Sequence, residues 1–174
     1  MTFSRRYAEQ NAGLNHLRET ISVGIFGSFS EDYLPVLRAT QKFLNANGFA
    51  RVKLSYDLST VHPRDSMEQE DDYNLRMSDL LLEESDLCIF YLFRQNDAFV
   101  NINESALMEL AAHRKTKDNH LAFLLIQNGA EFAGMARGTK GRYQYEEFND
   151  SQSAFRSVLK FCQNRVHEII QTQT

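Results

Sequence analysis

The chain has 174 residues, of which 43% are hydrophobic and 24% are charged, and these proportions are typical of one globular domain. The formal net charge of -4 gives no electrostatic basis for binding nucleic acid, because such binding depends on clustered lysine and arginine. No apolar run approaches the length that crosses a bilayer, and no secretory leader is evident. We therefore expect a single cytoplasmic domain over residues 1–174 that has no membrane partner.

The first half of the chain alternates predicted helices with predicted strands. Residues 1–20 are expected to form a helical extension of the domain. Residues 21–27 are a β-branched and aromatic run that predicts a buried strand, and residues 32–47 repeat apolar side chains at helical spacing. Residues 50–58 alternate in polarity and predict a second strand. A helix is expected over residues 66–84, whose acidic first half suits the positive end of a helix dipole.

The second half of the chain continues the alternation. Residues 86–93 form a continuous apolar run, which is typical of a strand covered on both faces. A short helix is expected over residues 103–114, followed by another buried strand over residues 120–126. Residues 128–142 contain four glycines and are expected to form a mobile loop. A short strand over residues 143–148 and a long carboxyl-terminal helix complete the pattern.

This alternation predicts an α/β fold, namely a flavodoxin-like open parallel sheet with helices on both faces and strand order 2-1-3-4-5. Ligands bind such sheets at the carboxyl ends of the strands, near the point where the strand order reverses. The rule indicates four loops, over residues 27–32, 57–65, 93–103 and 127–141. Cys88 and Cys162 lack the spacing of metal ligands, so we expect no metal ion, no disulfide and no cofactor.

The helix expected over residues 103–114 carries the most informative carboxylate. Ser105, Glu109 and His113 are four residues apart and share one helical face, which is most simply a solvated stripe. Helical side chains tilt toward the amino terminus, however, so Glu109 in the second turn leans toward the carboxyl edge of the sheet. The helix dipole there favours an ionised carboxylate. Both interpretations stay open at this point.

From residue 21 to residue 126 the chain resembles the nucleoside 2-deoxyribosyltransferases and the related nucleotide N-glycosidases. The resemblance rests on "GIFGSFSEDYLPVLRATQKFLNANGF", on "YNLRMSDLLLEESDLCIFYLF" and on "NESALMELAAH". In that family a glycine loop follows the first strand, a helix ending in a Ser-Asp pair leads into an apolar strand, and the next helix carries a glutamate. The family usually has glycines where this chain has "INESAL", so the bulkier residues are expected either to narrow the sugar pocket or to remove the activity.

The resemblance implies roles for particular residues. Glu109 would be the nucleophile that forms a glycosyl ester with the anomeric carbon. Asp79 lies one residue from the position of an acid that assists the leaving base. Gly27 and Ser28 would approach the sugar, and Phe29 would lie beside the base. Three more residues near the predicted edge are candidates for binding substrate: Arg94, Asn103 and Ser105.

The same region also resembles TIR domains, which share the sheet and whose NAD-cleaving members place a glutamate in this helix. Both resemblances imply an enzyme that breaks an N-glycosidic bond of a nucleoside, nucleotide or NAD-like small molecule. The alternative is a catalytically silent module that binds a nucleotide or a protein in signalling. A pocket joining Glu109 to Gly27 and Ser28 would favour the enzyme, and packing of Glu109 against another helix would count against it. Because the resembled transferases complete their sites with a neighbouring subunit, we expect a homodimer or larger.

Overall fold

The computed structural model describes residues 3–95, 101–131, 138 and 140–173. The strands are β1 (Ser22–Phe26), β2 (Arg51–Lys53), β3 (Leu87–Leu92), β4 (Ala122–Gln127) and β5 (Gln144–Phe148). The α-helices are α1 (Phe3–Thr20), α2 (Leu34–Ala46), α3 (Glu70–Glu84), α4 (Glu104–Thr116) and α6 (Ser151–Gln173). Two short 3-10 helices cover Ser55–Thr60 and Asn119–Leu121.

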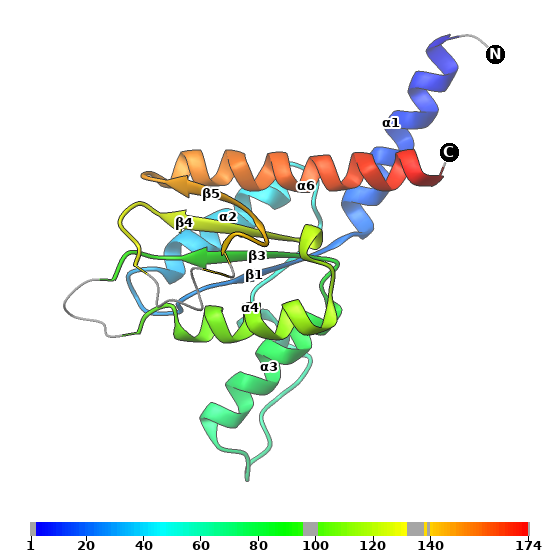
Figure 1. Cartoon of the computed structure of the whole chain (residues 1–174). Helices are drawn as coiled ribbons and strands as arrows, with labels where there is room; N and C mark the ends of the chain where they lie inside the picture. The colour runs from blue at the N-terminus through cyan, green and yellow to red at the C-terminus, as the bar shows by residue number, and fades with distance from the viewer. Residues whose placement is uncertain (1–2, 96–100, 132–137, 139, 174) are drawn as a thin grey trace.

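The strands form one five-stranded sheet in the order β2-β1-β3-β4-β5, and every pair of neighbours is parallel. Helices α2 and α6 lie on one face of this sheet, and α3 and α4 lie on the other (Figure 1). The predicted flavodoxin-like α/β arrangement and its strand order are therefore confirmed. Helix α1 packs against the end of α6 beyond the sheet, so the two termini lie close together.

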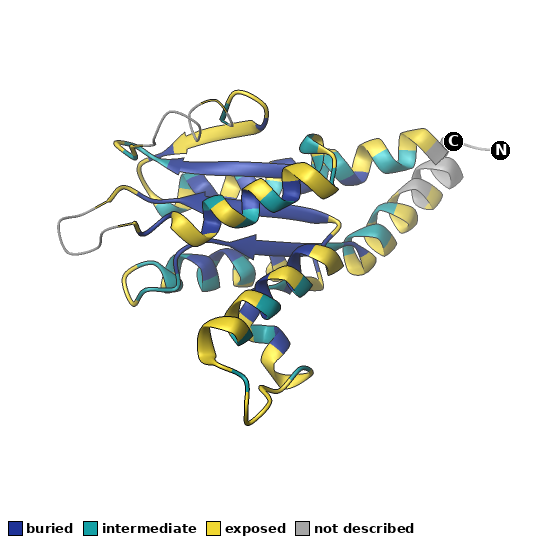
Figure 2. Ribbon diagram, turned by 60° about the horizontal axis from the view of Figure 1, so that its bottom comes forward, coloured by how far each residue is buried: buried dark blue, intermediate teal, exposed yellow. Residues whose placement is uncertain are grey.

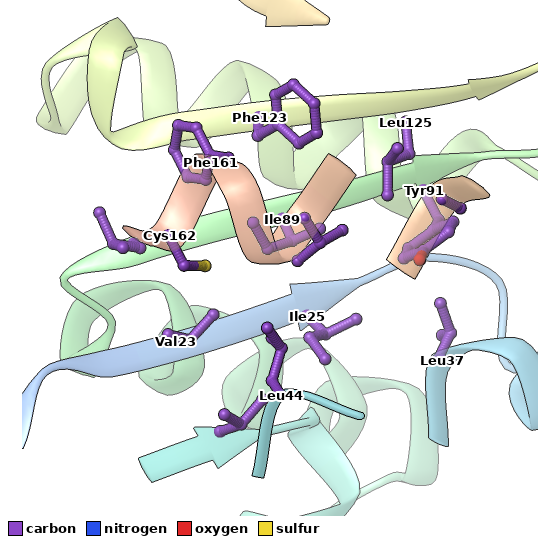
Figure 3. Packing of buried hydrophobic residues seen from close by; sticks show 14 of the residues in the cluster. Val23, Ile25, Leu37, Leu44, Ile89, Tyr91, Phe123, Leu125, Phe161 and Cys162 are labelled. Atoms are coloured by element: carbon purple, nitrogen blue, oxygen red, sulfur yellow. The ribbon is translucent and has the colours of Figure 1, made fainter. Parts of the chain in front are cut away.

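Two hydrophobic clusters hold the helices to the two faces of the sheet. Alternate side chains of the central strands pack with α2 and α6 in one cluster, which Figure 3 shows around Ile25, Ile89 and Leu125. The remaining strand side chains, such as Phe90 and Leu124, pack with α3 and α4 in the other cluster. All six residues of β3 are buried because helices cover both faces of that strand, as its continuous apolar run predicted (Figure 2).

The second strand is shorter than its sequence pattern predicted. A strand was expected over residues 50–58, but β2 has three residues and Ser55–Thr60 is a 3-10 helix. The Asp57 carboxylate accepts the backbone N–H of Leu54 at 2.8 Å and pairs with Arg38 at 2.5 Å. A local bond from a side chain to the backbone competes with the strand ladder, and a period-two pattern does not detect it.

Other predicted boundaries need smaller corrections. The helix expected from residue 66 begins at Glu70, because residues 66–69 form turns before it. The mobile loop expected over residues 128–142 lies partly outside the described residues, and residues 138 and 140 within it are helical. In the described ranges, no helix combines the length and hydrophobicity needed to span a membrane.

Candidate active site

The loops after β1 and β3 lie side by side at the carboxyl edge of the sheet, because these strands are neighbours. The Tyr33 hydroxyl donates a hydrogen bond to the backbone carbonyl of Arg94 at 3.2 Å, and the Tyr33 ring stacks on Phe93 with centroids 4.3 Å apart. The chain continues from β1 to β2 on one side and reaches β3 on the other, so this edge is the point where the strand order reverses.

Asn103 fastens the start of α4 to the end of β3. Its side-chain amide donates to the Phe93 carbonyl at 2.7 Å, and its carbonyl oxygen accepts the Phe93 N–H at 2.8 Å. The residue is only 8% exposed. Asn103 therefore holds the start of α4, the helix that carries Glu109, against the end of β3. Its contact with a substrate remains a prediction.

The loop after β1 has its own internal contacts. A Cβ at Gly27 would lie 3.0 Å from a methyl group of Leu37 and 3.2 Å from Cβ of Tyr91, so close packing alone explains this glycine. The Ser28 hydroxyl accepts the backbone N–H of Ser30 at 3.4 Å and lies 3.3 Å from the Ser30 hydroxyl. The predicted approach of these residues to a sugar remains a prediction.

An aromatic pair lies at the same edge. The Phe29 ring stacks on Tyr56 with ring centroids 4.6 Å apart, and Tyr56 is 45% exposed. The polarity pattern of residues 50–58 put Tyr56 inside a predicted strand and did not indicate it as a site residue. In the structure Tyr56 lies in the 3-10 helix after β2, at the carboxyl edge of the sheet. The exposed ring gives the edge a flat apolar surface of the kind on which bases stack.

The other predicted binding residues are exposed. Arg94 donates its backbone N–H to the side-chain oxygen of Gln127 at 2.9 Å, and its side chain passes close to Gly129. Ser105 is exposed in the first turn of α4. Arg94 and Ser105 are thus free to contact a ligand, and that role also remains a prediction.

Glu109 lies where α4 packs against α3. Ser78 of α3 donates a hydrogen bond to Oε1 of Glu109, while Oε2 is buried and has no hydrogen-bond partner within the described part of the chain. Burial raises the pKa of Glu109 from 4.5 to about 7; the bond from Ser78 lowers it in part, and the negative charge of Asp79 raises it further. Asp79, which the resemblance puts one residue from the position of an acid that assists the leaving base, is exposed, and its role remains a prediction.

Ser78 could have been found from the sequence by helical spacing. It lies three and four residues before Leu81 and Leu82, which are both buried against the sheet, so it belongs to the inner face of α3. The family resemblance indicated only the carboxylate of Asp79 in this helix and gave no role to Ser78, the residue before it.

The prediction that Ser105, Glu109 and His113 form a solvated stripe on α4 is wrong for His113. Ser105 is exposed and Glu109 is partly buried, but His113 is fully buried. The His113 ring lies 5.9 Å from the Phe90 ring, and its Nδ1 lies 3.4 Å from the Tyr143 hydroxyl. Burial lowers the pKa of His113 to about 4, so this side chain is neutral at pH 7.

Two cavities of the described part of the chain lie away from Glu109. A cavity of about 600 Å³ opens at the carboxyl ends of β4 and β5, where its wall includes Gln127, Lys140 and Glu147. A second cavity of about 640 Å³ lies at the opposite edge, near Ile21 and Lys117. Glu109 lines neither cavity and packs against α3, and this packing counts against the enzyme. Within the described ranges, no cluster of histidine, cysteine or carboxylate side chains is arranged to hold a metal ion.

Comparison with known proteins places the fold. No family model and no curated protein matches the chain. A CMP N-glycosidase from Clostridium botulinum has a similar structure, with a TM-score of 0.52 and 15% identity over 79% of this chain and 97% of that one. The chain has a nucleoside deoxyribosyltransferase-like fold. A 2-deoxyribosyltransferase from Bacillus psychrosaccharolyticus is similar too, with a TM-score of 0.51 and 15% identity over 77% of this chain and 90% of that one.

The deoxyribosyltransferase-like fold thus carries a partly buried carboxylate between α3 and α4. The carboxylate has one oxygen held by a hydroxyl and one oxygen that has no partner among the residues that the structure describes. An oxygen of this kind can accept a hydrogen bond from a ligand or attack an electrophilic carbon.

Proposed function

We propose that this protein breaks the N-glycosidic bond of a nucleoside or nucleotide, with Glu109 as the nucleophile. The observation that carries the proposal is the buried Oε2 of Glu109, which has no partner within the described residues. The names of the two structural neighbours, an N-glycosidase and a 2-deoxyribosyltransferase, support the same class of reaction.

The energetic cost of Glu109 favours a functional explanation. A carboxylate withdrawn from water without full hydrogen bonding destabilises the folded chain, and its pKa rises accordingly. Carboxylates with such strongly shifted pKa values are concentrated at functional sites, where the cost is retained for chemistry. A surface glutamate on α4 would have carried no such cost.

The reaction proceeds in two steps. Oε2 of Glu109 donates an electron pair to the anomeric carbon while the carbon–nitrogen bond breaks, and that bond's electrons leave with the base, which takes up a proton from water. A glycosyl ester of Glu109 results. Attack by water on the same carbon then releases the sugar and restores the carboxylate, and attack by a second base would give transfer instead. The exposed Tyr56 ring and Phe29 offer a stacking surface for the base, and Arg94 offers a positive charge for a phosphate.

A second candidate follows from the packing of Glu109. The side chain contacts Ser78 of α3, and the two cavities lie elsewhere, which is the arrangement that a catalytically silent binding module would show. The resemblance to TIR domains makes NAD a further candidate substrate for the active protein. These alternatives predict different results with the same set of compounds.

The decisive experiment incubates the protein with nucleosides, deoxynucleoside monophosphates and NAD and measures the released base by chromatography. Glu109→Gln keeps the size of the side chain but removes the anionic nucleophile, so base release should fall to the background rate. The matched control is Glu104→Gln, because Glu104 is exposed in the first turn of α4 and should be dispensable.

Each outcome has a clear meaning. Equal rates for the wild type and Glu109→Gln would remove Glu109 from the mechanism. Loss of activity in Glu104→Gln alone would place the nucleophile more than one helical turn earlier. If the wild type cleaves nothing but calorimetry detects binding of one of the compounds, the silent binding module is the better description. Cleavage of NAD alone would assign the TIR-like activity.

A further inference from the structure

We propose that Ser78 is a positioning residue, which holds Oε1 of Glu109 and leaves Oε2 as the oxygen that attacks the substrate. This inference rests on the proposed function of Glu109. The hydrogen bond between the two side chains is the observation behind it. It joins residues 31 positions apart in the chain, on two different helices.

Ser78 is well placed to fix an orientation. It is 8% exposed, and its neighbours Met77, Leu81 and Leu82 are buried in the cluster between α3 and the sheet. Its hydroxyl is attached to the backbone by a single carbon, so it moves little once α3 is packed. A longer side chain at this position would have more rotamers to lose when it binds the carboxylate.

The bond distinguishes the two oxygens of Glu109. Ser78 contacts Oε1, whereas Oε2 is buried and has no partner within the described residues. A carboxylate held by one oxygen cannot rotate freely about its last bond, so the other oxygen keeps one direction. Such preorganisation places the attacking atom before the substrate arrives and avoids reorganisation during the reaction.

The bond from Ser78 also acts on the pKa of Glu109 in the direction opposite to burial and to Asp79. Burial raises the pKa of Glu109, and the negative charge of Asp79 on α3 adds to that increase, while the bond from Ser78 lowers the pKa. The Cys88 thiol on β3 is neutral, because burial raises its pKa to about 12, and His113, one turn further along α4, is neutral as well. Ser78 is therefore the group described here that favours the ionised form by direct contact.

Three variants test this role. Ser78→Ala removes the hydroxyl, and Ser78→Thr keeps it. Ser85→Ala is the matched control, because Ser85 is equally buried on the same segment but donates to the backbone carbonyl of Leu81. Two measurements are made on each protein: the pKa of Glu109 by carbon-13 NMR of the free protein, and the dependence of base release on pH.

In Ser78→Ala the pKa of Glu109 should rise by about one unit, which is the usual effect of losing one hydrogen bond to a charged group. The maximal kcat at alkaline pH, where Glu109 is ionised in every variant, should still fall by about tenfold, because the carboxylate is no longer oriented. Ser78→Thr should restore most of both properties, and Ser85→Ala should change neither.

The two measurements separate the inference from the proposed function. An unchanged Glu109 pKa in Ser78→Ala would overturn the role of Ser78, whatever the activity. A raised pKa with full kcat at alkaline pH would show that Ser78 tunes the charge but does not orient the side chain, which also overturns the inference. If the wild type releases no base from any substrate, the proposed function fails, and a raised Glu109 pKa in Ser78→Ala would then show only that the hydrogen bond exists.

Discussion

At the scale of single residues, the most consequential feature is one carboxylate that the fold holds at a cost. The pKa of Glu109 rises from 4.5 to about 7 on folding, so between these values the folded chain binds more protons than the unfolded chain. The free energy of unfolding therefore falls as the pH rises through this window, and the cost is fully present above about pH 7. Because the ionised Glu109 lowers the stability of the fold, a contribution to folding does not explain why the chain has a glutamate at this position.

The raised pKa of Glu109 predicts how its replacement should change the free energy of unfolding at different pH values. Glu109→Gln should raise the free energy of unfolding by about 1 to 3 kcal/mol at pH 8, because the amide needs no ionisation, and by much less near pH 4. Urea unfolding curves of the wild type and the variant at several pH values measure the difference. Parallel curves over the whole range, with the same difference at each pH, would contradict the shifted pKa.

At the scale of elements, close contact between the sheet and α3 depends on one glycine of β1. Gly24 of β1 lies against Ser85 at the end of α3, and a Cβ at Gly24 would collide with the Ser85 hydroxyl and approach the Phe26 ring at 2.9 Å. Because Gly24 has no side chain, the end of α3 can lie close to β1 at this position. Helix α3 also packs against α4, where Ser78 contacts Glu109.

The corresponding prediction concerns two glycines. Gly24→Ala should lower the free energy of unfolding by about 1 to 3 kcal/mol, because the new methyl group forces α3 away from the sheet. Gly13→Ala in α1 is the control, since a Cβ there meets only a methyl group of Ile170 at 4.0 Å. It should be neutral or stabilise by up to about 1 kcal/mol, as alanine does in a helix. Equal effects in thermal unfolding would refute the packing argument.

At the scale of the whole molecule, the open question is assembly. Helix α1 and the last turns of α6 extend together past the sheet (Figure 1). The cavity of about 640 Å³ is lined in part by Leu17 and Thr20 of α1 and Ile169 of α6. Helices that leave the body of a domain in this way offer a surface for a second copy of the chain. The family resemblance predicts such an assembly independently.

We therefore expect a homodimer or larger in solution. Light scattering coupled to size exclusion should give at least twice the 20.1 kDa mass of the chain at micromolar concentration. Mixing inactive Glu109→Gln with the wild type shows whether subunits cooperate in one site, because shared sites would make activity depend nonlinearly on the mixing ratio. A mass of one chain at every concentration would disprove the prediction.

The sequence by itself determined the type of fold and the strongest candidate residue. The apolar run of β3, the alternation of strands with helices and the helical spacing of α2 and α6 depend on local periodicity, which survives in one dimension. Tertiary structure decided the neighbours of Glu109. Contact with Ser78, burial of His113 and the Tyr56 ring at the edge all depend on how distant segments pack. Periodicity indicates which face of an element is buried, but the sheet order and the close approach of α3 to α4 decide which side chains meet there.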